Sequence, residues 1–131
     1  MFGRSYRVQI HWQASWELLS LEYFVLRKDF RGIHERVRTA PLRNPCPRAS
    51  VTEDRICHAI DVTAALYFKN VQCLQRSAAA ACLLKKYGFR AEMVIGVQQL
   101  PFLAHAWVEV AGRVVNDKPY MAEIYSVLAR C

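Results

Sequence analysis

Residues 104–117 read AHAWVEVAGRVVND, and this stretch decides the fold. Apolar residues alternate with other types up to residue 110, which is the pattern of a β-strand. Because successive side chains point to opposite faces of a strand, His105, Trp107 and Glu109 share one face. Gly112 can take the positive φ that a short hairpin loop requires. We therefore predict a β-hairpin with a histidine held on its first strand.

The register of this hairpin decides what faces the histidine. If the loop is centred on Ala111, His105 lies opposite Asp117, and opposite residues project to the same face. The carboxylate of Asp117 then orients the imidazole. A register shifted by one residue sends Asp117 to the other face and leaves Asn116 as the substitute partner.

A predicted helix begins at Cys73. The run CLQRSAAAACLLKKYG at residues 73–88 is rich in alanine and leucine, and Gly88 suits the position after the helix end. A helix N-terminus offers unpaired N–H groups and a partial positive charge, which favour a reactive thiolate. The same N–H groups can receive the oxyanion of a tetrahedral intermediate. Cys73, His105 and Asp117 are therefore the expected nucleophile, base and orienting group.

The other cysteines have simpler interpretations. We expect Cys46, Cys57 and Cys82 to be structural, because an unactivated cysteine is usually a small buried apolar residue. The total of five is odd, which argues against a disulfide scaffold. No Cys-x-x-Cys pair exists, so no metal site and no cofactor are expected.

The first 48 residues are expected to form an N-terminal helical arm, with the catalytic core at 50–131. Within the arm, residues 6–12 alternate like a short strand and Ser15 is placed to begin a helix. Leu19, Tyr23, Leu26, Phe30, Ile33 and Val37 then form the helical stripe expected to face the core.

Three further residues, Leu18, Leu21 and Val25, widen that stripe. They are either more core or a surface that docks a partner protein, and docking is the prediction carried forward.

Three prolines over residues 41–47 exclude a helix there. Ser50 to Glu53 fits a capping box, which predicts a helix from about Thr52 to Lys69. Residues 92–97 form a further predicted strand, and the tail from Tyr120 has helix-like apolar spacing. The whole is an α+β domain, with N-terminal helices packed on a small antiparallel sheet.

Composition sets the broad class. The chain has 131 residues, 53% hydrophobic residues and a formal net charge of +7. This size suits one domain. The basic residues are scattered, so nucleic-acid binding has only charge in its favour. The start of the chain has no secretory h-region, and the most apolar stretch, Trp16 to Leu26, is too short and too charged to cross a membrane. We expect a cytoplasmic protein with reduced thiols.

Three motifs carry a family resemblance. Cys73-Leu74-Gln75-Arg76-Ser77, Ala104 to Glu109, and Val115-Asn116-Asp117 resemble the motifs of the lasso-peptide leader peptidases. That family has the transglutaminase-like fold, which is related to papain, and a Cys, His and Asp in this order. The resemblance spans roughly Thr52 to Asp117 and implies catalytic roles for Cys73, His105 and Asp117.

The resemblance also implies partners. The substrate is a precursor peptide cut at its leader–core junction. The chain leaves no room for a recognition module before Thr52, so a separate small leader-recognition protein is expected. An ATP-dependent macrolactam cyclase then closes the ring. Trp107 either lines the substrate groove or packs in the core. The alternatives are acyl transfer to an amine by the same triad, and a non-catalytic peptide-binding adaptor.

Overall fold

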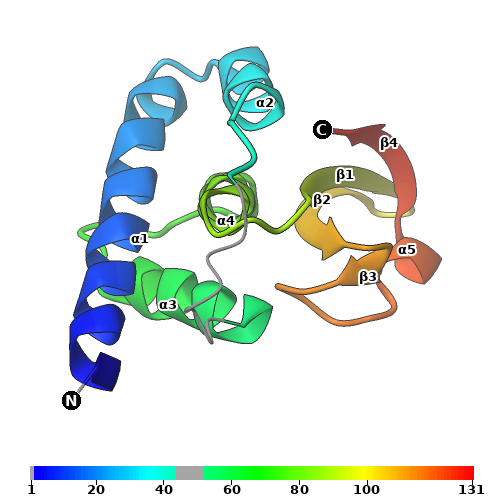
Figure 1. Cartoon of the computed structure of the whole chain (residues 1–131). Helices are drawn as coiled ribbons and strands as arrows, with labels where there is room; N and C mark the ends of the chain where they lie inside the picture. The colour runs from blue at the N-terminus through cyan, green and yellow to red at the C-terminus, as the bar shows by residue number, and fades with distance from the viewer. Residues whose placement is uncertain (1, 44–51) are drawn as a thin grey trace.

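The computed structural model describes residues 2–43 and 52–131, in which a helical half precedes a sheet half (Figure 1). The helices are α1 (Phe2–Leu26), α2 (Phe30–Arg38), α3 (Glu53–Ala65), α4 (Cys73–Lys86) and the short α5 (Met121–Ile124). The strands are β1 (Ala91–Gln99), β2 (Phe102–Val110), β3 (Arg113–Val114) and β4 (Ser126–Arg130). The predicted α+β class is confirmed.

The sheet is antiparallel, with strand order β3-β2-β1-β4. The predicted hairpin is its centre, where Ala91 pairs with Val110 and Gln99 with Phe102. The tail differs from the sequence prediction. After the four residues of α5 it becomes β4, which pairs with the free edge of β1. Pairing with that edge satisfies backbone groups that a continued helix would have left exposed.

Helix α4 lies between α1 and the sheet (Figure 1) and contributes many of the core residues. Its four alanines, Ala78 to Ala81, are fully buried. Small side chains let neighbouring elements approach the helix closely, and α4 contacts α1, α2, α3, β1 and β2. Its C-terminus closes as predicted: Gly88 has a φ of 90°, its N–H donates to Lys85 O, and Phe89 N–H donates to Leu84 O.

The start of the chain is helical, so the strand predicted over residues 6–12 is wrong. Ser15 does not begin a helix either; it lies inside α1, and its hydroxyl donates to the carbonyl of His11 at 2.9 Å. Helix α1 ends before Lys28, which has a φ of 54°. The Asp29 side chain then accepts from Gly32 N–H and begins α2.

The two faces of α1 are exchanged relative to the prediction. Leu18 and Leu21 have 0% exposure and lie in the core, and Val25 packs against it. Leu19 and Tyr23, expected inside, are more than half exposed. A docking role for Leu18, Leu21 and Val25 is therefore wrong, because these side chains are covered by the protein's own core.

Thr52 caps the N-terminus of α3, where its side chain accepts from Arg55 N–H, and the helix ends at Ala65 rather than near Lys69. The predicted capping role of Ser50 lies outside the described residues, as does Cys46.

Two carboxylates are buried between α1 and its neighbours. Glu17 pairs with Lys86 at 2.6 Å and with Arg36 at 3.4 Å, which ties α1 to α4 and α2. Glu22 accepts from Tyr67 Oη and Gln75 Nε2, each at 3.0 Å. Buried charges persist when they are paired and hydrogen-bonded, so these contacts hold α1 in place against α4.

Candidate active site

Cys73 is the first residue of α4. Gln72 before it has extended geometry and makes no side-chain cap, so the first N–H groups of the helix keep no capping partner from that residue. The Cys73 thiol is free and partly buried. This is the predicted location, with a thiol beside the positive end of a helix dipole.

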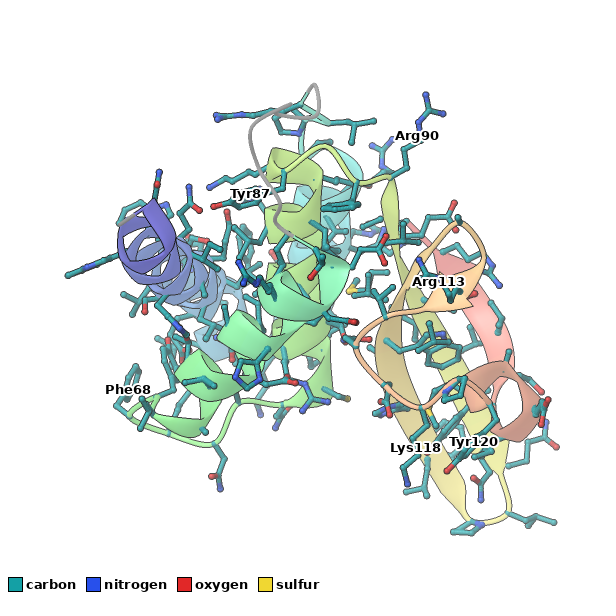
Figure 2. All side chains as sticks on the ribbon, turned by 60° about the horizontal axis from the view of Figure 1, so that its bottom comes forward. Phe68, Tyr87, Arg90, Arg113, Lys118 and Tyr120 are labelled. Carbon is teal, nitrogen blue, oxygen red and sulfur yellow. The ribbon has the colours of Figure 1, made fainter. Side chains whose placement is uncertain are left out.

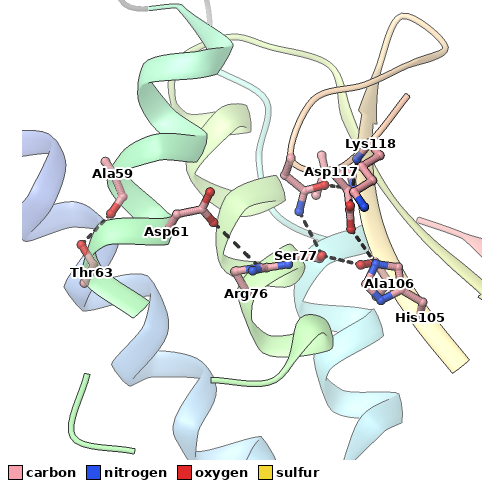
Figure 3. Close-up of polar contacts among 11 residues, drawn as sticks. Ala59, Asp61, Thr63, Arg76, Ser77, His105, Ala106, Asp117 and Lys118 are labelled. Carbon is pink, nitrogen blue, oxygen red and sulfur yellow. Dashed lines mark hydrogen bonds and ion pairs between the residues drawn. The ribbon is translucent and has the colours of Figure 1, made fainter. Parts of the chain in front are cut away.

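His105 and Asp117 form a short polar contact (Figure 3). His105 Nε2 and Asp117 Oδ2 are 2.6 Å apart, and Asp117 Oδ1 accepts from Lys118 N–H at 2.8 Å. Burial raises the pKa of Asp117, but the hydrogen bonds from His105 and Lys118 and the charge of Arg76 outweigh it, so the net pKa is lowered. A carboxylate that stays ionised beside an imidazole stabilises its protonated form.

Asp117 contacts His105, but the strand pairing differs from the predicted register. Val110 pairs with Arg113 across a two-residue turn in which Ala111 and Gly112 have φ of 54° and 74°. The strand pairing is thus shifted by one residue from the register predicted for a loop centred on Ala111. The ladder ends at Val114, and the chain then bends so that Asp117 returns to the histidine. The contact was predicted correctly, but the paired geometry was not.

Asn116 and Ser77 hold this bend against the open edge of β2. Asn116 Oδ1 accepts from Val108 N–H at 2.7 Å, and its Nδ2 donates to Ser77 Oγ at 3.1 Å. Ser77 Oγ in turn donates to the carbonyl of Ala106 at 2.9 Å (Figure 3). β3 pairs only with the last two residues of β2, so these side chains satisfy backbone groups that lack a strand partner.

The hydrogen bonds of Asn116 and Ser77, called here the clamp, also bring Cys73 toward His105 and Asp117. Ser77 is four residues after Cys73, so the two lie on one face of α4. That face meets β2 at Ala106, the neighbour of His105. Among the described residues no hydrogen bond joins the Cys73 sulfur to the His105 ring. The structure thus brings two of the three predicted residues into contact and places the third one helical turn from the clamp.

Comparison with known proteins identifies the family of the chain. The family model of the transglutaminase-like superfamily matches residues 16–130. The chain belongs to the transglutaminase-like superfamily. It is also 46% identical over 57 residues to the microcin J25-processing protein McjB of Escherichia coli, a match that covers 44% of this chain and 27% of that protein. No solved structure gives a significant match.

In this transglutaminase-like chain, aromatic rings surround the histidine. Tyr125 stacks on the His105 ring with centroids 5.3 Å apart, and Trp107 lies at 6.2 Å. Trp107 has 0% exposure, so the alternative of a groove-lining residue is wrong and the packing alternative holds. Gly96 pairs with His105 across the sheet, and a Cβ there would meet Trp107 Cη2 at 2.7 Å and Tyr125 Cβ at 2.8 Å.

The sequence did not identify Tyr125, because its contact depends on the tail folding back as β4.

The remaining described cysteines lack the environment of a nucleophile. Burial, with nearby acidic groups adding to it, raises the pKa of Cys57 to about 12. Burial also raises the pKa of Cys82 to about 11 and raises that of Cys131. Cys57 and Cys82 are buried, as predicted.

Arg76 adds a positive charge next to the site. Its Nε lies 3.9 Å from Asp61 Oδ1, and its charge lowers the pKa of Asp117 (Figure 3). Burial raises the pKa of Asp61, partly opposed by Arg76. The guanidinium therefore lies between two carboxylates, three residues after Cys73, a role that sequence spacing alone did not suggest.

Proposed function

We propose that this chain is a cysteine peptidase that removes the leader from a lasso-peptide precursor in the cytoplasm. Cys73 is the nucleophile, His105 the general base and acid, and Asp117 the group that orients the imidazole. The 2.6 Å contact between His105 and Asp117 carries the proposal, because that pair has the chemistry of a base with its orienter. The similarity to the microcin J25-processing protein supports lasso-peptide maturation as the context.

Acylation follows from the site chemistry. Because Nε2 of His105 is engaged by Asp117, Nδ1 is the nitrogen that takes the Cys73 proton. The thiolate attacks the carbonyl carbon of the last leader residue, and the oxyanion lies near the first N–H groups of α4. The carbon–nitrogen bond then breaks, and His105 gives its proton to the amine of the departing core peptide.

Deacylation releases the leader. His105 takes a proton from water, the resulting hydroxide attacks the thioester carbonyl, and the second tetrahedral intermediate collapses. The carbon–sulfur bond breaks, and the proton held by His105 returns to the Cys73 sulfur. The products are a leader carboxylic acid and a core peptide with a free amine.

The partners follow the same proposal. A separate leader-recognition protein presents the precursor, which raises the effective concentration of the scissile bond at Cys73. An ATP-dependent cyclase then uses the free amine of the core peptide to form the macrolactam. Among the described residues no helix is long and apolar enough to cross a membrane.

Cleavage assays test the proposal. The precursor is incubated with the chain and the recognition protein from its gene neighbourhood, and the products are identified by mass spectrometry. Cys73→Ala and His105→Ala are each expected to lose several orders of magnitude in rate while the thermal transition is retained. Cys82→Ala is the matched control and is expected to keep activity. An inactive Cys82→Ala with an active Cys73→Ala contradicts the assignment.

The same assays separate the alternatives. A leader–amine adduct in place of free leader acid indicates acyl transfer. For the adaptor alternative, iodoacetamide labelling is followed by peptide mapping in a Cys46→Ser background. The peptidase requires Cys73 to react much faster than Cys131, whose pKa is raised by burial. Equal labelling of the two indicates an adaptor.

A further inference from the structure

Helix α1 presents a row of large apolar side chains to solvent. Trp12 is 73% exposed, Trp16 65% and Leu26 72%, and Leu19 and Tyr23 are more than half exposed. These five positions follow one another at steps of 4, 3, 4 and 3, so they lie on one side of the helix. They are called here the α1 apolar face.

No exposed charge interrupts this face. Between Gln9 and Leu26 the acidic residues are Glu17 and Glu22, and the stretch has no Lys or Arg. Both carboxylates are buried and paired with cations of other elements. Single exposed apolar residues are ordinary, but a contiguous apolar row of this length on a small protein marks a contact surface.

A hollow adjoins the α1 apolar face. A pocket of about 590 Å³ lies between α1 and the C-terminal end of α3, and its walls include Leu19, Val62, Leu66, Tyr67 and Phe68. Leu66 and Phe68 are strongly exposed at its rim. Figure 2 shows Phe68 at the outer edge of the helical half, away from Lys118 and Tyr120, which lie in the loop beside the sheet. A concave apolar site of this size accepts large side chains.

Basic residues follow the α1 apolar face. Arg27, Lys28 and Arg31 are exposed, and the Arg27 guanidinium lies 5.0 Å from the centre of the Tyr23 ring. The nearby Asp29 is engaged as the N-cap of α2. The surface therefore matches an occupant that is apolar along its length and acidic at one end.

We infer that the α1 apolar face and its pocket dock a polypeptide partner, which inserts apolar side chains into the pocket and sets acidic residues against Arg27 and Lys28. Resting on the proposed function, this partner is the leader-recognition protein. A second copy of the chain fits less well, because the face carries no exposed acid to meet the basic end and each copy has a formal net charge of +7. A flat lipid surface leaves the pocket unfilled.

The docking surface is connected to the nucleophile helix. Tyr67 forms part of the pocket wall and donates to Glu22 Oε2. The same oxygen accepts from Gln75, two residues after Cys73, and the Glu22 carboxylate also pairs with Lys69. Residues 66–72 join the pocket directly to the start of α4. A partner bound at Tyr67 therefore presents the precursor peptide beside the segment that positions Cys73.

Binding measurements test the inference. The affinity of the purified recognition protein for the whole chain is measured by fluorescence anisotropy. Trp16→Glu and Leu19→Glu are each expected to weaken binding at least about 30-fold, since exposed aromatic and apolar anchors carry most of an interface's affinity. Leu100→Glu, at a 92% exposed residue in the β1–β2 turn, is the matched control and is expected to bind normally. The double variant Arg27→Glu with Lys28→Glu is expected to weaken binding and reduce its salt dependence.

Each variant is first checked for an unchanged thermal transition and an unchanged rate of Cys73 alkylation, so that a folding defect is not mistaken for lost docking. The inference is overturned if the recognition protein does not bind, or binds Trp16→Glu and Leu19→Glu like the unmodified chain. It is also overturned if these variants abolish a dimer seen by sedimentation, or abolish binding to vesicles of phosphatidylglycerol and phosphatidylcholine. Normal binding without any cleavage refutes the proposed function instead and leaves the docking surface standing.

Discussion

Asn116 and Asp117 are neighbours with the same side-chain length, but they make different contacts. Asp117 contacts the imidazole of His105, whereas Asn116 hydrogen-bonds to the backbone of Val108 and to the hydroxyl of Ser77. We therefore predict that Asp117→Asn loses activity with little loss of stability. Asn116→Ala is expected to lose stability first.

The size of the Asp117→Asn effect follows from the contact it changes. A hydrogen bond to a charged group contributes about 1.5–3 kcal/mol, which corresponds to roughly a 10- to 150-fold loss in rate. The loss is larger if the new amide donates to Nε2, because the ring proton then moves to Nδ1, which can no longer accept the Cys73 proton. In a serine protease triad this tautomer change costs about 10⁴-fold. The expected loss lies between these bounds.

The cost of Asn116→Ala is a folding cost. Val108 is fully buried, and its N–H loses its acceptor when the amide is removed. A buried donor left unsatisfied costs about 1–3 kcal/mol, and the lost bond to Ser77 adds about 1 kcal/mol. The free energy of unfolding is expected to fall by about 2–4 kcal/mol, with the β2 edge loosened beside His105.

Two readouts separate the variants without any knowledge of the substrate. Urea unfolding gives the stability, and the rate of Cys73 alkylation reports the reactivity that the proposed triad gives this thiol. Asp117→Asn is expected to slow alkylation at nearly unchanged urea midpoint, and Asn116→Ala to shift the midpoint. Alkylation within twofold of the unmodified chain for Asp117→Asn would falsify the orienting role. A lowered midpoint in Asp117→Asn alone would show that the two residues had been assigned the wrong way round.

Acid unfolding tests whether the ionised Asp117 carboxylate stabilises the fold. The pKa of Asp117 is lowered in the folded state, so its carboxylate adds a small amount of stability above the ordinary aspartate pKa of about 3.9. That contribution is lost as the pH falls through the lower folded-state value. Asp117→Asn has no such group, and its stability is expected to depend less steeply on pH below about 4.

Two further predictions concern the scaffold. Gly96→Ala places a Cβ within 3 Å of Trp107 and Tyr125, and we expect it to displace the rings that flank His105, with changed near-ultraviolet dichroism and slower Cys73 alkylation; an unchanged spectrum contradicts the packing. Leu18→Ala is expected to lower the free energy of unfolding by about 2–5 kcal/mol, and its neighbour Leu19→Ala by less than about 0.5 kcal/mol. Equal losses in urea unfolding would mean that the buried face of α1 is assigned incorrectly.

The elements nearest the chemistry could be predicted because their signals are local. Helix propensity over residues 73–86 and a glycine at the helix end define α4 within the segment itself. Strict alternation defines β2 in the same way, since a strand with one face in the core shows its period directly. Cys73 and His105 inherit their positions from these two elements, so both positions were available from sequence.

The approach of Asp117 to His105 depends on contacts that no local pattern contains. A one-residue change of register was expected to separate the two side chains. The separation does not occur because the ladder stops at Val114, and Asn116 then bonds the β2 edge and the hydroxyl of Ser77. Ser77 is 39 residues away in the chain, so its part in forming the bend was visible only in three dimensions.

The sequence does not distinguish the buried side of helix α1 from its exposed side. Both sides are apolar, and the acidic residues that usually mark the solvent side, Glu17 and Glu22, flank the Leu18–Leu21 side. Reading them as exposed turns that side outward. The structure buries both carboxylates instead, and the cations that allow this, Lys86 for Glu17 and Lys69 for Glu22, come from α4 and the segment before it. Because charge pairing far along the chain decides which apolar side is covered, the other side remains in solvent. An apolar row that the fold itself does not use is the kind of surface that a binding partner covers.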